Sequence, residues 1–347
     1  MVFSMTQAEQ DRRKTLVLFD LTPLLLSRLP EKLSQAIGSA AICRLLSTQN
    51  AGYWSLLSGE GWEDVSCLVI FGHRLPDLCL ASAATQNNVT VHYVQHGLFK
   101  ERLERNIFSL VGLIKLKAGY YFRSYLKSRN QYPHIFTWRS LVTLVTSTLV
   151  SNKYVSIFLR DSHTEINTAY VYDDAQVDIY RTILGDAVSG YLTVGYLDSG
   201  RMDNSPPPEK SATFICQSLV EDGRMSEQAY KTALKLALKL LERDGWNVQL
   251  FLHQRSNRQL YVSLGLEQKI TDNVWQLPSS DLYLTDYSTL ILEPFSKGRK
   301  VARLAISGHE PMDDLRQIPK YPEYVAGGAT HQEQDPFSAI AENILIT

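Results

Sequence analysis

Cysteine is scarce in this sequence, long apolar runs are missing, and the net charge is close to zero. The 347 residues include only four cysteines, which lie far apart and form no CxxC pair; they are Cys43, Cys67, Cys79 and Cys216. This spacing favours buried, reduced thiols over a disulfide framework or a zinc site. No apolar run is long enough to span a bilayer, residues 1–13 lack the apolar core of a secretion signal, and the net charge of -1 argues against bulk nucleic-acid binding. We therefore expect a soluble, cytoplasmic protein that does not bind nucleic acid.

Several motifs of well-known active sites are also missing. The chain has no GxxxxGK[ST] loop, which argues against a P-loop NTPase, and no GxGxxG follows its first apolar strand. No HExxH motif and no cluster of cysteine and histidine indicates a metal site. We therefore expect no metal and no cofactor.

Apolar runs of strand length alternate with helical patterns along the chain, which is typical of an α/β protein with a parallel sheet. The predicted strands are residues 14–20, 65–71, 89–94, 152–159, 169–172, 212–219, 248–252, 274–277 and 282–284. Helical spacing predicts helices over residues 24–42 and 226–243, and near the end of the chain over 338–345, with Ser338 as the cap.

A polar, proline-rich stretch over residues 203–210 is the best candidate for a linker between two such sheets. The chain is long enough for two domains that each bury a core. We predict an N-terminal domain over 1–200 and a C-terminal domain over 210–347.

Polar residues at the ends of predicted strands in the second domain favour a phosphate site. Asp286, Ser288 and Thr289 follow one strand and precede an apolar run that Lys297 and Gly298 close. This pattern is typical of a helix whose first amides and hydroxyls could hold an anion, although a simply capped helix fits it as well. His253 and Arg255 follow another strand, and such a cation pair facing a helix start could clamp a phosphate.

Two strand ends in the first domain carry candidate catalytic groups. His96 is followed by Gly97, which would let the backbone approach a ligand closely, and an imidazole there could transfer a proton near neutral pH. A histidine that only bonds its own loop fits equally. Asp173 and Asp174 could supply a general base, or Asp173 could cap the following helix.

Residues 99–129 are basic, with apolar and aromatic side chains between the charges. This composition fits peripheral contact with an anionic membrane, and it also fits a solvated helix with one face in the core.

Four short motifs together resemble one family of bacterial polymer-building transferases. They are QHG at 95–97, VGYLDSGR at 194–201, LHQR at 252–255 and TDYSTLILEP at 285–294. In this order they are similar to the CDP-glycerol glycerophosphotransferases of teichoic acid synthesis and to related GT-B capsule enzymes. The similarity covers about residues 90–305. It implies two Rossmann-like domains with parallel sheets facing a central cleft, the first for the acceptor and the second for the nucleotide donor.

The resemblance also implies roles for residues. His96 would be a base or activate the acceptor, His253 would contact the leaving phosphate, and Ser288 and Thr289 would contact the nucleotide phosphates. Glu293 would accept from the ribose hydroxyls, although it could equally face solvent. Two departures stand out: Gln254 replaces the usual proline, and Asp173-Asp174-Ala175 lacks the glycine of sialyltransferases, so a sialyl donor is not favoured.

The function so implied is a metal-independent transferase. It would move a sugar or polyol phosphate from a CMP, CDP or alternatively UDP donor to a surface glycan or lipid-linked acceptor, on the inner face of the plasma membrane. The alternatives are an epimerase of the UDP-N-acetylglucosamine 2-epimerase type and a non-catalytic GT-B partner subunit. The donor sugar, acceptor, linkage and oligomeric state stay open at this point.

Overall fold

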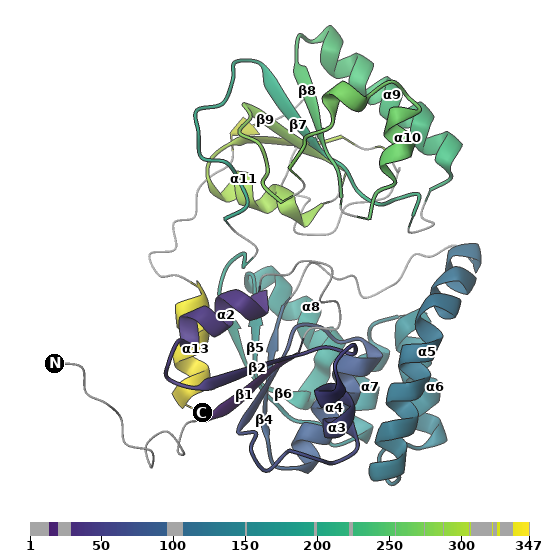
Figure 1. Cartoon of the computed structure of the whole chain (residues 1–347), viewed down its shortest axis with the longest axis vertical. Helices are drawn as coiled ribbons and strands as arrows, with labels where there is room; N and C mark the ends of the chain where they lie inside the picture. The colour runs from purple at the N-terminus through teal and green to yellow at the C-terminus, as the bar shows by residue number, and fades with distance from the viewer. Residues whose placement is uncertain are drawn as a thin grey trace, which may run out of the picture. The chain divides into compact units, whose positions relative to one another are not determined.

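The chain forms two compact units (Figure 1). Unit 1 comprises Met1–Leu103, Leu113–Leu197 and Glu333–Thr347, and unit 2 comprises Glu104–Gly112 and Asp198–Gln332. A computed structural model describes residues 14–19, 29–95, 107–149, 151–197, 200–221, 225–253, 255–273, 275–286, 288–304, 306, 321, 325–326 and 336–346.

Unit 1 is built on a six-stranded parallel sheet in the order β2-β1-β3-β4-β5-β6. Its strands are β1 Thr15–Phe19, β2 Ile42–Leu46, β3 Cys67–Ile70, β4 Thr90–Val94, β5 Ile166–Val171 and β6 Val188–Thr193. The central strands are continuous apolar runs because helices cover both faces of such a sheet. Phe19 on β1, for example, is fully buried and stacks on Tyr53 at 4.9 Å.

Eight α-helices are described in unit 1. They are α2 Leu29–Ile37, α3 Ala51–Leu57, α4 Leu75–Gln86, α5 Ile107–Gln131, α6 Trp138–Leu149, α7 Tyr154–Asp161, α8 Asp174–Leu184 and α13 Pro336–Ile346. A 3₁₀ turn, Gly185–Ala187, links α8 to β6. The first residues of α5 fall in the stretch that clusters with unit 2.

Unit 2 repeats this design around a five-stranded sheet in the order β11-β10-β9-β7-β8. Its strands are β7 Ser211–Ile215, β8 Asn247–Phe251, β9 Leu282–Thr285, β10 Lys300–Arg303 and the short antiparallel β11 Val325–Ala326. Its helices are α9 Glu227–Arg243, α10 Arg258–Val262 and α11 Leu292–Ser296, with 3₁₀ turns at η3 Glu267–Lys269 and η4 Thr289–Ile291. The predicted helix over 226–243 is confirmed, and Ser226 caps it by accepting from the N–H of Ala229.

The two parallel sheets follow the same winding. In each sheet, the second strand of the chain lies on one side of the first strand, and the third and fourth strands lie on its other side. This is a doubly wound, Rossmann-like arrangement. The predicted α/β class with two Rossmann-like domains is confirmed, and the predicted cleft between the domains stays a prediction.

Some predicted elements differ from the structure. Residues 152–159 are helical in α7, not a strand, and their buried side chains Val155, Phe158 and Leu159 recur at helical spacing. Of residues 274–277, also predicted as a strand, the described residues 275–277 form a bridge between Leu277 and Met202 and no strand.

The last helix differs from its prediction in start and in place. It begins at Pro336, not after a Ser338 cap, and it packs on α2 in unit 1 although the predicted second domain ran to residue 347. The Lys14 ammonium donates to the carbonyl of Leu345 at 3.1 Å, which ties the helix to the start of β1.

Candidate functional site

The strand order of unit 2 indicates where a ligand can bind. In a doubly wound sheet, ligands bind beyond the carboxyl ends of the strands, at the point where the winding reverses. Here this point lies between β7 and β9, and β8 lies on the other side of β7. Because neighbouring strands are about 4.8 Å apart, the ends of β8 and β9 are separated by about 10 Å. The predicted phosphate-binding residues come from these two ends, with the end of β7 between them.

Hydrogen bonds hold Ser288 at the carboxyl end of β9. The hydroxyl of Thr285 donates to the carbonyl of Ile215 on β7 at 3.1 Å and accepts from the N–H of Ser288 at 3.0 Å. The hydroxyl oxygen of Ser288 accepts from the N–H of Leu290 at 3.3 Å, so Ser288 caps the next turn as predicted. A serine hydroxyl that accepts in this way can still donate its proton to a phosphate oxygen.

The predicted helix after Ser288 starts with the 3₁₀ turn η4 before it becomes α11. The N–H of Ile291 bonds the carbonyl of Ser288 at 3.2 Å, and that of Leu290 bonds the Ser288 hydroxyl. These two amides therefore have partners within the chain, and anion binding by the first helix amides stays a prediction. The hydroxyls of Ser288 and Thr289 are the donors that this turn offers. Asp286, directly after β9, is buried.

The loop after β8 presents the predicted cations. The ring nitrogen Nδ1 of His253 accepts from the backbone N–H of Arg255 at 3.2 Å. Because Nδ1 accepts, the neutral ring carries its proton on Nε2, which makes Nε2 a donor. Arg255 is exposed and His253 half-buried. Gln254, where the sequence departs from the similar family, lies outside the described residues.

Gln217 lies two residues beyond β7, between the ends of β8 and β9, and the sequence analysis missed it. Its side-chain oxygen Oε1 is buried and has no hydrogen-bond partner within the described part of the chain. A buried acceptor without a donor is costly, and an N–H or O–H group of a ligand would satisfy it. The position of Gln217 in the sequence could have indicated it, because it is the first polar residue after the apolar run that ends β7.

Glu293, predicted to bind ribose, already has a complete set of partners in the chain. Its buried carboxylate accepts from the backbone N–H groups of Gly200 at 2.8 Å, Arg201 at 3.1 Å and Met202 at 3.0 Å. The ammonium of Lys297, one turn later, lies 3.0 Å from Oε1. These bonds anchor the segment 200–202 to α11. Ribose binding by Glu293 stays a prediction, and in this structure the carboxylate has a structural role.

The structure describes only some of the catalytic candidates of unit 1. His96 and Gly97 lie outside the described residues. The preceding residue, Gln95, is held firmly, since its Oε1 accepts from the N–H of Tyr172 and its Nε2 donates to Gln176, both at 2.8 Å. Asp173 caps α8 by accepting from the N–H of Gln176 at 3.0 Å. The cap prediction is confirmed, and a catalytic role for Asp173 stays a prediction.

His73, at the end of β3, is buried. Desolvation lowers its pKa to about 3 from the ordinary 6.5, and the charge of neighbouring Arg74 adds to this effect. His73 is therefore neutral at pH 7, and its Nδ1 lies 3.1 Å from the hydroxyl of Tyr93 in the core. A neutral, core-bonded imidazole is poorly suited to proton transfer at a surface site.

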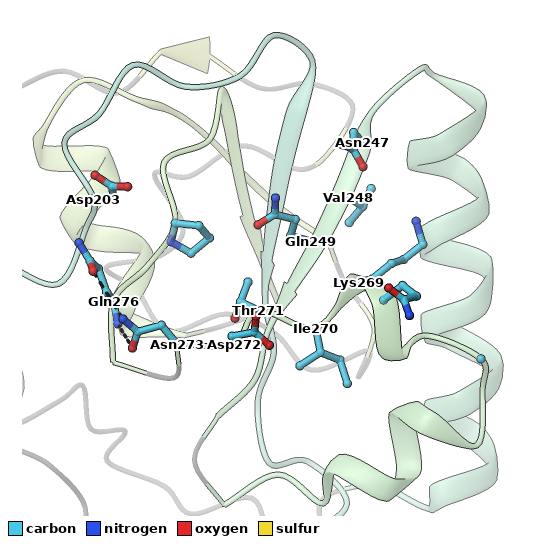
Figure 2. A pocket seen from close by; sticks show the side chains of 13 residues that line it. Asp203, Asn247, Val248, Gln249, Lys269, Ile270, Thr271, Asp272, Asn273 and Gln276 are labelled. Carbon is cyan, nitrogen blue, oxygen red and sulfur yellow. Dashed lines mark hydrogen bonds between the residues drawn. The ribbon is translucent and has the colours of Figure 1, made fainter.

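A cavity of 710 Å³ opens beside β8 in unit 2 (Figure 2). The first three residues of β8 and the segment 268–273 contribute to its lining, which is rich in amide side chains. In Figure 2, Asn273 and Gln276 bond each other at its rim, where the N–H of Gln276 donates to Asn273 at 3.2 Å. None of the predicted phosphate-binding residues lines this cavity, so it is separate from the strand-end site.

The described part of the chain contains no group of three or more His, Cys, Asp or Glu side chains arranged to hold a metal ion. Among the same residues, no helix combines the length and apolar character needed to cross a bilayer.

No family model and no curated protein sequence matches the chain. Solved structures with a similar arrangement include the S. aureus MnaA–UDP co-structure, at 10% identity and a TM-score of 0.48, over 96% of this chain and 88% of that chain. A UDP-N-acetylglucosamine 2-epimerase matches at 11% identity and a TM-score of 0.45, over 96% and 87%. CalG4, the calicheamicin glycosyltransferase, matches at 12% identity and a TM-score of 0.42, over 97% and 91%. The fold assignment rests on the two sheets themselves, because all three TM-scores are below 0.5.

Proposed function

We propose that the chain is a GT-B transferase that uses a nucleotide-activated donor. It transfers a sugar or a polyol phosphate to a surface glycan or a lipid-linked acceptor. The donor nucleotide is CMP or CDP, with UDP as the alternative, and it binds unit 2. The resemblance of the four sequence motifs to glycerophosphotransferases supports the cytidine nucleotides.

One observation carries the proposal. The winding of unit 2 reverses between β7 and β9, and polar groups suited to a nucleoside diphosphate follow the neighbouring strand ends. Hydroxyl donors come from Ser288 and Thr289 after β9, and the loop after β8 supplies the Nε2–H donor of His253 and the guanidinium of Arg255. The unsatisfied oxygen of Gln217 comes from β7, between them.

These groups would perform two tasks. Arg255 can bind a phosphate through two parallel hydrogen bonds, and His253 can donate from Nε2 to the leaving phosphate. Fixed donors of this kind offset the charge that develops on the leaving group, so the proposed reaction needs no metal ion. His96 would act from unit 1 as the base that activates the acceptor hydroxyl.

A thermal-unfolding panel with CMP, CDP, UDP and GDP tests the proposal. A nucleotide present at one hundred times its Kd should stabilise the protein by about 2.7 kcal/mol. We expect CDP or CMP to give the largest shift. If none of the four nucleotides raises the unfolding temperature, the proposal is wrong.

The alternatives separate in an activity assay. Epimerisation of the UDP-N-acetylglucosamine 2-epimerase type is the alternative reaction to measure. Turnover of UDP-N-acetylglucosamine without any acceptor would favour an epimerase. A non-catalytic partner subunit would bind the enzyme that performs the transfer and would not turn over the donor itself. A His96 substitution would then leave the glycan of the organism unchanged.

A further inference from the structure

Helix α6 has apolar side chains on both sides, because Leu144 is buried in the core of unit 1 while other large apolar residues of the helix are exposed. Ser140 and Ser147 are 6% and 4% exposed, whereas Trp138, Val142 and Val145 are 70%, 49% and 42% exposed. The three apolar residues recur at the spacing of one helix face. A helix at the surface of a water-soluble domain normally carries polar side chains on its exposed face, so these exposed apolar residues are unusual.

The described end of α5 shows the same pattern, with Tyr125 buried in the core and other large apolar side chains exposed. Ser124 and Ser128 are fully buried, while Phe122 and Leu126, one turn apart, are 55% and 38% exposed. The two helices follow one another in the chain, and both lie outside the sheet of unit 1 (Figure 1). We call the exposed side chains Phe122, Leu126, Trp138, Val142 and Val145 the outer apolar face.

Local hydrogen bonds explain why the small polar side chains can be buried. The hydroxyl of Ser147 donates to the carbonyl of Leu144 at 2.7 Å, and that of Ser140 donates to the carbonyl of Ile135 at 2.5 Å. Ser124 accepts from the hydroxyl of Tyr53 at 3.0 Å. Buried hydroxyls with such partners carry little penalty, and their small size lets helices pack closely. Of these buried serines, Ser128 has a hydroxyl without a hydrogen-bond partner among the described residues. The exposed apolar groups on the other side of the two helices are left for an outside contact.

The charges of the stretch that carries the outer apolar face indicate what this face contacts. No acidic residue occurs in the sequence between Glu104 and Asp161, whereas this stretch carries Arg105, Lys115, Lys117, Arg123, Lys127, Arg129, Arg139, Lys153 and Arg160. Asp161 pairs with Arg139 at 3.4 Å and with Arg160 at 3.3 Å, which leaves the other cations in excess. A second copy of the chain docked on this face would bring two such basic stretches together, which is unfavourable. An anionic lipid surface offers negative headgroups to the cations and acyl chains to the apolar residues.

We propose that the outer apolar face docks unit 1 on an anionic bilayer, with Trp138 inserted at the headgroup boundary. Aromatic residues of this type are favoured at that depth. Arg129 lies on the same helix as Phe122 and Leu126 and contacts the headgroups. Arg123 lies over the ring of Trp54 at 4.3 Å and Lys127 donates to the hydroxyl of Ser58 at 3.1 Å, so these two cations add to the positive potential of this part of unit 1. This surface extends the membrane contact expected for residues 99–129 to α6, and it is independent of the nucleotide site.

Vesicle cosedimentation tests the proposal. The wild-type protein is mixed with vesicles of equal parts phosphatidylglycerol and phosphatidylcholine, or of phosphatidylcholine alone. We expect binding to the anionic vesicles at low salt, release as salt rises, and little binding to the neutral vesicles. The apolar variant, Phe122→Ser/Trp138→Ser/Val142→Ser, should bind the anionic vesicles at least about tenfold more weakly because insertion is lost.

A matched control removes comparable exposed apolar groups from unit 2. The variant Leu236→Ser/Trp275→Ser replaces side chains that are 64% and 39% exposed, and it should bind vesicles like the wild type. All three proteins should melt alike and bind nucleotide alike, which separates this surface from the proposed reaction. Wild-type protein that ignores anionic vesicles at low salt would overturn the proposal. So would an apolar variant that binds vesicles as tightly as the wild type, or a wild-type dimer that this variant dissociates.

Discussion

The carboxylate of Glu293 accepts a hydrogen bond from the backbone N–H of Met202 at 3.0 Å, across ninety-one positions of sequence. Two further amides, those of Gly200 and Arg201, bond the same carboxylate. This side chain therefore joins the end of the VGYLDSGR motif to the TDYSTLILEP motif within unit 2. Because the site residue Ser288 precedes the same short helix, the anchor also steadies the turn on which the proposed phosphate donors lie.

Replacing Glu293 by glutamine should destabilise the protein. The substituted amide keeps the shape, but its NH₂ group meets backbone N–H donors and Lys297 loses its charged partner. We expect the free energy of unfolding to fall by about 3 kcal/mol, the usual loss when one member of a buried, bonded charge group is removed. Urea unfolding followed by circular dichroism measures this change.

The matched control for that variant is Glu227→Gln, which removes an exposed pair with Lys231 at 2.7 Å. Such surface pairs contribute less than about 1 kcal/mol, so this variant should unfold almost like the wild type. A Glu293→Gln protein that keeps full stability but loses nucleotide affinity would instead support the ribose-binding role and contradict the anchor.

Stability should depend on pH through two buried histidines. Desolvation lowers the pKa of His92 from the ordinary 6.5 to about 4. It is also the main cause that lowers the pKa of His73 to about 3. Below pH 6.5 the two histidines bind protons in the unfolded chain but stay neutral in the folded protein. The free energy of unfolding therefore falls as pH decreases toward 4. Each histidine contributes about 1.4 kcal/mol per pH unit in this window and nothing well above it.

Unfolding midpoints measured from about pH 7 down to about pH 5 check this expectation. The variant His92→Gln removes one titrating group, so its stability should change less steeply with pH, whatever its absolute stability. An identical slope in the variant and the wild type would show that His92 does not titrate on unfolding.

The buried strands were predictable because burial on both faces leaves a continuous apolar run in the sequence. β1, β3, β4, β7 and β9 follow this rule, since all of their residues, or all but the first, are buried. β2 was missed because it is an edge strand that pairs only with β1, and its Ile42 and Leu45 stay exposed. The helix α7 was misassigned because its β-branched residues favour strands locally, whereas packing of one face decided for helix.

The candidate site was predictable where a side chain follows a strand, and not where it depends on neighbours in space. The sequence indicated His253, Arg255 and Ser288 from their position after apolar runs. It could not show that β7 separates the two strand ends, since strand order is a property of the whole sheet. It also could not show that distant backbone amides occupy Glu293, or that Gln217 has a buried oxygen without a partner.

Substitution of His96 tests the proposed chemistry in unit 1. If His96 is the general base, His96→Ala should lower kcat by about 10²–10⁴-fold. The nucleotide affinity and melting temperature should stay near those of the wild type, since donor binding lies in unit 2. Asp173→Asn, which keeps an oxygen that can cap α8, is the comparison for the second catalytic candidate. An active His96→Ala enzyme would refute the role of His96 as the base.

Calorimetric titration of CDP and UDP tests the central claim most directly. The account predicts that His253→Ala and Arg255→Ala each weaken nucleotide binding by about 1.5–3 kcal/mol, the value of a hydrogen bond to a charged group. The matched control is Arg258→Ala, which removes an exposed arginine at the start of α10, three residues after Arg255. This control should bind as the wild type does. Unchanged affinity in both His253→Ala and Arg255→Ala, or an equal loss in Arg258→Ala, would contradict a nucleotide site at the strand ends of unit 2.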